Sequence, residues 1–110
     1  MGVTKTDNYL PEHNDMGNLL KALAHPARVA ILEYLMNINT CICGDIVKEL
    51  NLAQPTVSQH LKEMKQARII KGTVEGNAIC YCLDEDTLKK LRDYFGSVLN
   101  ILEGKKFDCC

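Results

Sequence analysis

The chain has 110 residues, of which 46% are hydrophobic and 25% charged, and its formal net charge is -1. This length suits one domain with one core, and the composition is that of an ordinary globular protein, which excludes disordered and fibrous classes. No stretch approaches the roughly 18 uninterrupted apolar residues of a spanning helix, and the opening residues hold no apolar run, so we expect a cytoplasmic protein with no membrane contact. Because the net charge gives no global sign of nucleic-acid binding, a DNA-binding surface would have to be local.

Two helices are predicted in the first part of the chain. The polar segment 1–12 is expected to be flexible. Asn14 or Asp15 can cap a short helix, which we expect to end near His25. Pro26 then suits the first turn of a second helix, because its ring fixes a helical φ and its missing N–H needs no partner there.

A pair of short helices is predicted in the middle of the chain. Apolar residues at i, i+3, i+4 and i+7 from Cys43 to Leu50 predict the first of them. Pro55 occupies a first-turn position of the second, which is expected to reach about Gln66. About three or four residues separate the two helices, which is the spacing that a helix-turn-helix requires.

A β-hairpin is predicted next, in residues 68–83. Its two halves are rich in β-branched residues and flank a turn-forming Glu-Gly-Asn sequence at 75–77. Asp84 or Asp86 can cap a final helix, whose apolar residues step by three and four as far as Leu102. This apolar row would be exposed on a single small domain, so we expect it to form the interface of a homodimer.

These elements define a fold class that is mainly α with a β-hairpin wing. The predicted order is four helices, two strands and a fifth helix, which is the arrangement of a winged helix-turn-helix. We assign this DNA-binding and dimerisation domain to residues 13–103, after the flexible segment 1–12 and before a cysteine-containing tail at 104–110.

The second helix of the pair carries the candidate DNA-binding residues. Its amino-terminal half offers short or planar hydrogen-bonding side chains, which suit base edges in double-stranded DNA. From Lys48 to Lys71, basic residues outnumber acidic ones by five to two, so this region can hold phosphates while the helix reads bases. The predicted DNA-binding residues are Gln54, Thr56, Ser58, Gln59, His60 and Lys62.

Two segments, LKALAHPARVAILEYL and AQPTVSQHLKEMKQARIIKGTVEGNAICYCL, resemble the ArsR family of metalloregulatory repressors over about residues 17–102. The match is carried by the AHPAR sequence at 24–28, by SQHL at 58–61 and by the hairpin containing Gly76. The resemblance implies a homodimer that binds an inverted-repeat operator and dissociates when an inducer binds. It also implies that Arg28 shapes the fold rather than reads bases.

Six cysteines, in a chain expected to occupy a reducing compartment, indicate metal binding or redox sensing. The pair Cys41 and Cys43 resembles the cysteine pair of arsenic- and cadmium-responsive family members, at a helix start that favours the ligating thiolate form. Trivalent arsenic or antimony prefers three thiolates, and the terminal pair Cys109 and Cys110 is expected to supply the remaining ligand. Cys80 and Cys82 share one face of a predicted strand, where they would form a third thiol cluster or pack in the wing, and we interpret them as packing residues.

Other chemistries stay open for the same thiols. The four sulfurs of Cys41, Cys43, Cys109 and Cys110 would also suit cadmium(II) or lead(II), and a disulfide or persulfide switch would use the same groups. The family resemblance implies that zinc is not favoured, because zinc-responsive members use Asp and His pairs on the last helix and the final helix here has no histidine.

No enzyme activity and no resident cofactor are expected. The arginine of a C-x5-R phosphate loop is missing after each of the four internal cysteines. The sequence therefore predicts a repressor that dissociates from its operator when cysteine thiolates bind trivalent arsenic or antimony.

Overall fold

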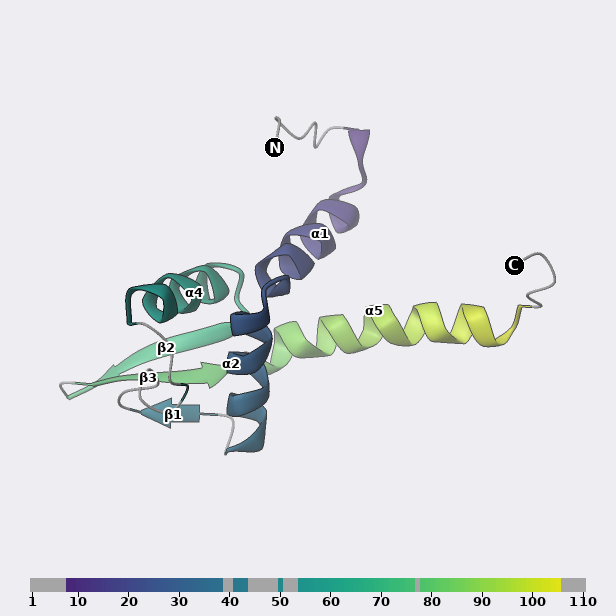
Figure 1. The fold of residues 1–110 in the computed structure, drawn as a ribbon. Coiled ribbons are helices and arrows are strands. Elements are labelled where there is room, and N and C mark those ends of the chain that lie inside the picture. Colours follow the sequence, from purple (N-terminus) through teal and green to yellow (C-terminus); the bar gives the residue numbers. More distant parts are fainter. Residues whose placement is uncertain (1–7, 39–40, 44–49, 51–53, 77, 106–110) are drawn as a thin grey trace.

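The computed structural model describes residues 8–38, 41–43, 50, 54–76 and 78–105 (Figure 1). No helix within these ranges is long and apolar enough to cross a membrane. Figure 1 shows α5 extending away from a body that the other elements form around a small sheet. The elements in chain order are α1 (Pro11–Leu23), α2 (Pro26–Asn37), β1 (Cys41–Cys43), α4 (Gln54–Gln66), β2 (Ile70–Glu75), β3 (Ala78–Leu83) and α5 (Glu85–Glu103).

The first helix begins earlier than predicted. Its first residue is Pro11, and the N-cap position is held by Leu10, which makes no side-chain capping hydrogen bond. The expectation that Asn14 or Asp15 caps this helix is therefore wrong. A proline at the first helical position has the required φ and no N–H to satisfy, so this helix starts without a polar cap.

The second helix begins where it was predicted, at Pro26. His25 is its N-cap, and the imidazole Nδ1 accepts a hydrogen bond of 3.0 Å from the backbone N–H of Ala27. This bond satisfies one of the free N–H groups of the first turn.

The sheet contains a strand that was not predicted. Cys41–Cys43 forms β1 and pairs antiparallel with β3, so the strand order is β1-β3-β2. The expectation that Cys43 starts a helix is therefore wrong. Three residues are too few to show the alternation of a strand, and the pairing partner lies far away in the sequence. The rest of the predicted helix to Leu50 falls largely outside the described residues, although Leu50 itself is helical.

The predicted hairpin is confirmed. Strands β2 and β3 pair antiparallel from Ile70 opposite Leu83 to Glu75 opposite Ala78, which leaves a two-residue turn beginning at Gly76. Gly76 has φ +62°, a left-handed value that glycine adopts without steric cost. The hairpin is the wing of the fold.

The core lies where α1, α2, α4 and the inner face of the sheet meet. Contacts join α2 to both α4 and β3, and α4 to β2. This arrangement holds α4 against the body along one side and leaves its other side exposed. The core cluster consists of Leu19, Ile31, Leu35, Val57, Leu61, Met64, Ile69, Ile70 and Leu83.

Candidate nucleic-acid interface and thiol site

The predicted reading helix, α4, has one buried and one exposed side. Val57 and Met64 are fully buried and Leu61 is nearly so, and these positions recur at helical spacing. The opposite side is polar, and the structure describes four of the predicted DNA-binding side chains there. Thr56, Ser58, Gln59 and Lys62 are all exposed. The side chain of Gln54 lies outside the described set.

His60 does not belong to this exposed side. It is only 6% exposed, its ring lies 4.4 Å from that of His25, and its Nδ1 accepts a hydrogen bond of 2.9 Å from Nε of Arg28. His60 therefore does not share the exposed side of α4 with the other predicted DNA-binding residues. Its spacing, three residues after Val57 and four before Met64, places it on the buried side of the helix.

Burial also affects the charge state of His60. The pKa of His60 is lowered below 6.5, chiefly because burial disfavours the charged ring and further because His25 and Arg28 add positive charge nearby. The buried Nε2 atom of this ring has no hydrogen-bond partner among the described groups. A neutral ring whose Nδ1 accepts from Arg28 is consistent with both observations.

Arg28 ties three helices together. Besides His60, its guanidinium donates to the backbone carbonyl of Ala22 at 3.0 Å and forms an ion pair with Glu63. Glu63 in turn accepts a hydrogen bond of 3.1 Å from the side-chain amide of Gln59. These contacts support the structural role that the family resemblance implies for Arg28, and they connect it to a predicted base-reading residue.

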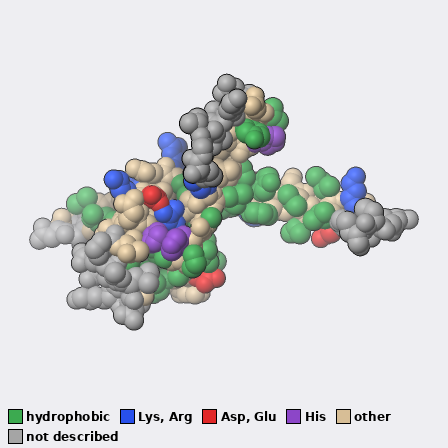
Figure 2. All heavy atoms as spheres, turned by 45° about the horizontal axis from the view of Figure 1, so that its top comes forward, with side chains coloured by type: hydrophobic (Ala, Val, Ile, Leu, Met, Phe, Trp, Pro, Cys, Tyr) green, Lys and Arg blue, Asp and Glu red, His purple; other side chains and the backbone are tan. Residues whose placement is uncertain are grey.

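The basic side chains of α4 and of the segment that follows it are exposed. Lys62 and Lys65 lie on the helix, Arg68 follows it and Lys71 lies on β2, and all four are exposed. Figure 2 shows Lys, Arg and His side chains on the body of the molecule, with hydrophobic side chains along the projecting α5. Lys62 and Lys65 therefore place positive charge on the surface of α4. Arg68 lines a hollow with residues of α1 and α5, and Lys71 lies on the face of the sheet that carries Cys82.

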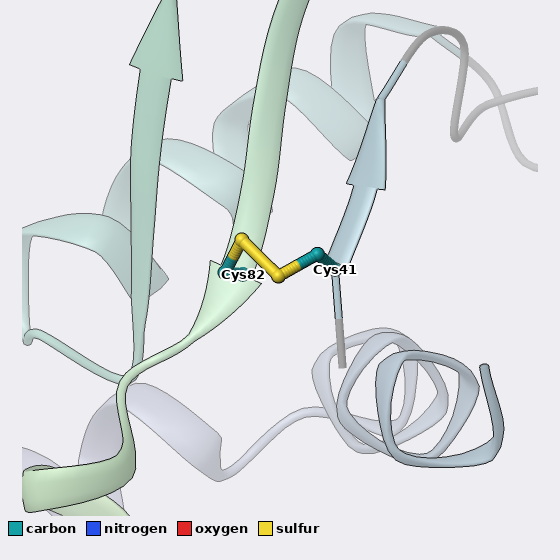
Figure 3. Close-up of a disulfide and its surroundings, with 2 residues drawn as sticks. All are labelled: Cys41 and Cys82. Atoms are coloured by element: carbon teal, nitrogen blue, oxygen red, sulfur yellow. A yellow bond between two sulfur atoms is a disulfide. The ribbon is translucent and has the colours of Figure 1, made fainter. Parts of the chain in front are cut away.

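Two of the cysteines form a pair that was not predicted from the sequence. Cys41 on β1 and Cys82 on β3 are joined by a disulfide, with their Cα atoms 4.0 Å apart (Figure 3). Cys80 is also disulfide-bonded and is 4% exposed. The interpretation of Cys82 as a packing residue is therefore wrong. The i, i+2 spacing of both pairs is the signal that could have indicated facing positions on two strands.

The predicted metal site is only partly described. The structure describes the side chain of Cys41 but not those of Cys43, Cys109 and Cys110. Within the described part of the chain, no group of three or more His, Cys, Asp or Glu side chains is arranged to hold a metal ion. With its sulfur in a disulfide, Cys41 has no thiolate to offer in this state.

A surface hollow lies beside the disulfide. Strands β1, β2 and β3 and the first turns of α5 line it, so it connects the cysteine pair to solvent. The lining residues are Cys41, Lys71, Cys82, Leu83, Glu85, Leu88, Lys89 and Arg92.

The final helix is capped as predicted and exposes apolar residues. The Asp84 carboxylate accepts from the backbone N–H groups of Asp86 and Thr87. Leu91 packs against the core of its own chain, whereas the apolar residues after it project from the body. The exposed large apolar residues of α5 are Tyr94, Phe95, Leu99, Ile101 and Leu102.

The fold defined by these elements is a winged helix-turn-helix, and solved structures share it. The crystal structure of an ArsR family transcriptional regulator matches with a TM-score of 0.70 at 17% identity, over 89% of this chain and 98% of that chain. The transcriptional repressor PagR of Bacillus anthracis matches with a TM-score of 0.62 at 29% identity, over 76% of this chain and 95% of that chain.

Sequence comparison identifies the family. The model of the bacterial regulatory proteins of the arsR family matches residues 25–71. The HTH-type transcriptional repressor SmtB of Mycobacterium tuberculosis is 40% identical over 72 residues, which are 66% of this chain and 53% of that protein. The transcriptional repressor SdpR of Bacillus subtilis is 32% identical over 77% of this chain and 93% of that protein. The chain belongs to the ArsR family.

A third relative is named for arsenic. The arsenical resistance operon repressor of Staphylococcus xylosus is 28% identical over 88% of this chain and 88% of that protein. The match to SmtB spans about half of that relative's length. All three relatives are named as repressors rather than enzymes, which agrees with the expectation from the sequence.

Proposed function

We propose that this chain is a transcriptional repressor in which α4 reads base edges in the major groove of operator DNA. The observation that carries the proposal is the two-sided character of α4, with Val57 and Met64 fully buried and Ser58 and Gln59 exposed. A helix held by its apolar side against a core can present its polar side to base edges as a rigid unit.

The basic residues of α4 suit a phosphate-binding role. Lys62 lies on the exposed side of the helix, and Lys65 adds a second exposed cation on the same helix. Contacts of this kind position a protein on the duplex without reading its sequence. The wing would then lie along the phosphate backbone of the DNA, next to the major groove that α4 occupies.

The proposed active form is a homodimer on an inverted repeat. The exposed apolar residues of α5, among them Phe95 at 47% and Leu99 at 56% exposure, lie on a helix that projects from the body. Burying this row against a second copy would remove it from water. Two-fold symmetry would place the two α4 helices in successive major grooves, about one helical turn apart.

The proposed inducer is trivalent arsenic or antimony, bound by thiolates that include Cys41 and Cys43. Two observations support this choice: both residues lie on β1, directly before the segment that is predicted to begin the helix-turn-helix, and one relative is named as an arsenical resistance operon repressor. Cys109 and Cys110 remain candidates for the third ligand, and cadmium(II) or lead(II) remain alternative inducers. A cytoplasmic setting, in which thiols stay reduced, belongs to this proposal.

The proposed role of α4 in reading DNA is tested by two variants, one of which should change base preference and the other overall affinity. Gln59→Ala should relax base preference at particular positions, by about 1–3 kcal/mol for a lost good contact. Lys62→Ala should weaken binding to all sequences alike and reduce the dependence of affinity on salt. The measurement is the affinity for a selected operator and its single-base variants over a range of salt concentrations. Unchanged base preference in Gln59→Ala and in Ser58→Ala would exclude α4 as the reading helix.

The inducer part is tested with the reduced full chain bound to that operator. Arsenite should release the wild-type protein, whereas Cys41→Ser should bind operator normally and ignore arsenite. An inducer must bind the DNA-free state more tightly than the DNA-bound state, so removing a ligand abolishes release and leaves repression intact. Loss of operator binding by Cys41→Ser without arsenite would contradict this role.

A redox or persulfide switch is the second candidate, and the disulfide between Cys41 and Cys82 favours it. In that case an oxidant alone would release the operator, and a reducing thiol would restore binding. Arsenite-dependent release from the fully reduced protein, with no release by oxidant, would decide for the metalloid.

A further inference from the structure

We infer that Cys82 on the wing strand β3 is a ligand of the inducer, so that Cys41 and Cys82 form a cross-strand dithiol for a thiophilic trivalent metalloid. The inference rests on the proposed function and names its binding site more closely. It places the site between β1 and the wing, within the described domain, rather than between β1 and the terminal pair at 109–110.

The first support is the strand register. Cys41 lies directly opposite Cys82 in the antiparallel ladder, and directly opposite residues project from the same face of a sheet. The two sulfurs are close enough to be bonded, and the Cα atoms are 4.0 Å apart. After reduction, the same backbone positions leave two thiols facing each other, which is the arrangement that a small trivalent ion bridges.

The second support is a nearby candidate for the third sulfur. Cys80 lies two residues from Cys82 on β3, so it projects from the same face, and the register pairs it with Cys43. Cys80 is 4% exposed, so a ligand bound there would be shielded from water. Three thiolates are the set that trivalent arsenic prefers, and β1 and β3 together carry enough cysteines to supply them.

The third support is the charge and access around the pair. Lys71 on β2 lies directly opposite Cys82, which has Cys41 of β1 opposite it on the other edge of β3. Lys71, Lys89 and Arg92 all line the surface hollow beside the disulfide. Glu85 contributes a carboxylate to this lining. Neighbouring cations stabilise a thiolate, which is the form that binds a metalloid, and the hollow lets a small neutral molecule such as As(OH)₃ reach the sulfurs.

Arsenic stays trivalent throughout the proposed binding reaction. Two equivalents of a reducing thiol open the Cys41–Cys82 disulfide by exchange, which gives two protein thiols and one small-molecule disulfide, and the same exchange reduces the disulfide of Cys80 to supply the third thiol. Three protein thiols then react with As(OH)₃ to form three As–S bonds, and three water molecules leave. Because the same sulfurs serve both states, the oxidised protein cannot bind arsenite at this site.

The positions of Cys41 and Cys82 explain how inducer binding could affect both the DNA-reading helix and the proposed dimer helix. Cys41 begins β1, directly before the segment that is predicted to begin the helix-turn-helix, and Cys82 lies two residues before Asp84, the cap of α5. A bound ion would therefore link the chain leading into the DNA-reading unit to the chain leading into the proposed dimer helix.

The test measures arsenite binding to the reduced full chain without DNA, so that it does not depend on operator binding. Arsenite is titrated while thiolate-to-arsenic absorbance is followed, and remaining free thiols are counted. We expect Cys82→Ser to lower arsenite affinity at least about tenfold, because a chelating sulfur is lost. The double variant Cys109→Ser with Cys110→Ser tests the rival third ligands and should bind like the wild type; a loss as large as that of Cys82→Ser would contradict the placement of the site. Unchanged affinity in Cys82→Ser, or no arsenite binding by the wild type, would overturn the inference.

A second measurement guards against misfolding of the variant. Wild-type protein is oxidised and digested with trypsin and chymotrypsin, because the tryptic peptides 29–48 and 72–89 each contain two cysteines and cleavage after Tyr81 separates Cys80 from Cys82. Fragmentation of the linked peptides in the mass spectrometer distinguishes Cys41 from Cys43 and verifies the link between Cys41 and Cys82. This sample should not take up arsenite, and a reducing thiol should restore uptake. Equal uptake before and after reduction would contradict the shared-sulfur site. If arsenite binds as predicted but does not release operator, the proposed inducer function fails while the site stands.

Discussion

Arg28 on α2 and His60 on α4 are joined by a hydrogen bond of 2.9 Å from the guanidinium Nε to the imidazole Nδ1. The same guanidinium pairs with Glu63 on α4 and donates to the carbonyl of Ala22 on α1. The planar guanidinium has enough N–H groups for all three partners at once. The orientation of α4, and with it the exposed side of that helix, therefore depends on one residue of α2.

Replacing Arg28 by lysine should destabilise the fold although the charge is kept. An ammonium group cannot reach His60, Glu63 and Ala22 together, so buried polar groups would lose partners, at a cost of about 1–3 kcal/mol in the free energy of unfolding. Arg92→Lys is the control, because Arg92 is exposed and pairs with the exposed Asp93; it should change stability by less than about 0.5 kcal/mol. Urea unfolding measures both. Equal effects of the two variants would contradict the bridging role.

The stability of the protein should fall as the pH is lowered, because of His60. Its pKa in the folded state is lowered below 6.5, first by burial and then by His25 and Arg28. As the pH falls through 6.5, the unfolded chain takes up this proton before the folded chain does, so the free energy of unfolding decreases. The contribution of His60 is fully present above that pH and is lost progressively as the pH approaches its folded pKa.

The variant His60→Gln isolates this effect. Urea unfolding between about pH 5 and pH 8 should show a smaller loss of stability at low pH than in the wild type. His13→Gln is the matched control, since His13 is exposed on α1, and its pH profile should follow the wild type. An identical pH dependence for the wild type and His60→Gln would show that the ring takes up its proton equally in both states.

Arg68, directly after α4, holds a backbone conformation that favours glycine. Its φ is +63°, its N–H donates to the carbonyl of Lys65, and the N–H of Ile69 donates to the carbonyl of Met64. This is a Schellman end, in which glycine is the usual residue at the left-handed position. Arg68→Gly should therefore raise the free energy of unfolding by up to about 1 kcal/mol, because the steric cost of the side chain disappears.

The control for Arg68→Gly is Gln66→Gly, within the same helix. There the backbone is helical and glycine should lower stability by about 1 kcal/mol. Thermal and urea unfolding would reveal the opposite signs. A loss of stability in Arg68→Gly would mean that its side chain contributes more than the backbone conformation costs.

A charged residue in the apolar row of α5 should produce a monomer. Leu99 is 56% exposed and projects with the rest of the helix, so Leu99→Glu should disrupt a dimer interface without disturbing the core of one chain. Asn100→Glu, at the next and already exposed polar position, is the control. Analytical ultracentrifugation should find a monomer for the first variant and a dimer for the second. A dimer in both would place the interface elsewhere.

Local signals in the sequence determined most of the architecture. First-turn prolines predicted α2 and α4, and the helical spacing of apolar residues predicted α5. The turn residues before Ala78 predicted the wing, because turn chemistry, like periodicity, depends on neighbours in the chain. The exposed polar side of α4 follows from the same spacing. The same spacing, three residues after Val57 and four before Met64, places His60 on the buried side of α4.

Tertiary structure decided what the cysteines do. Cys41 and Cys82 are 41 residues apart in sequence, and strand pairing alone brings them together. A three-residue strand has too little pattern of its own to be recognised, and its existence depends on the hydrogen-bonding edge that β3 offers. For the same reason, the contact of Arg28 with His60 became visible only once α2 and α4 were packed, because a hydrogen bond between distant residues requires the fold that aligns its donor and acceptor.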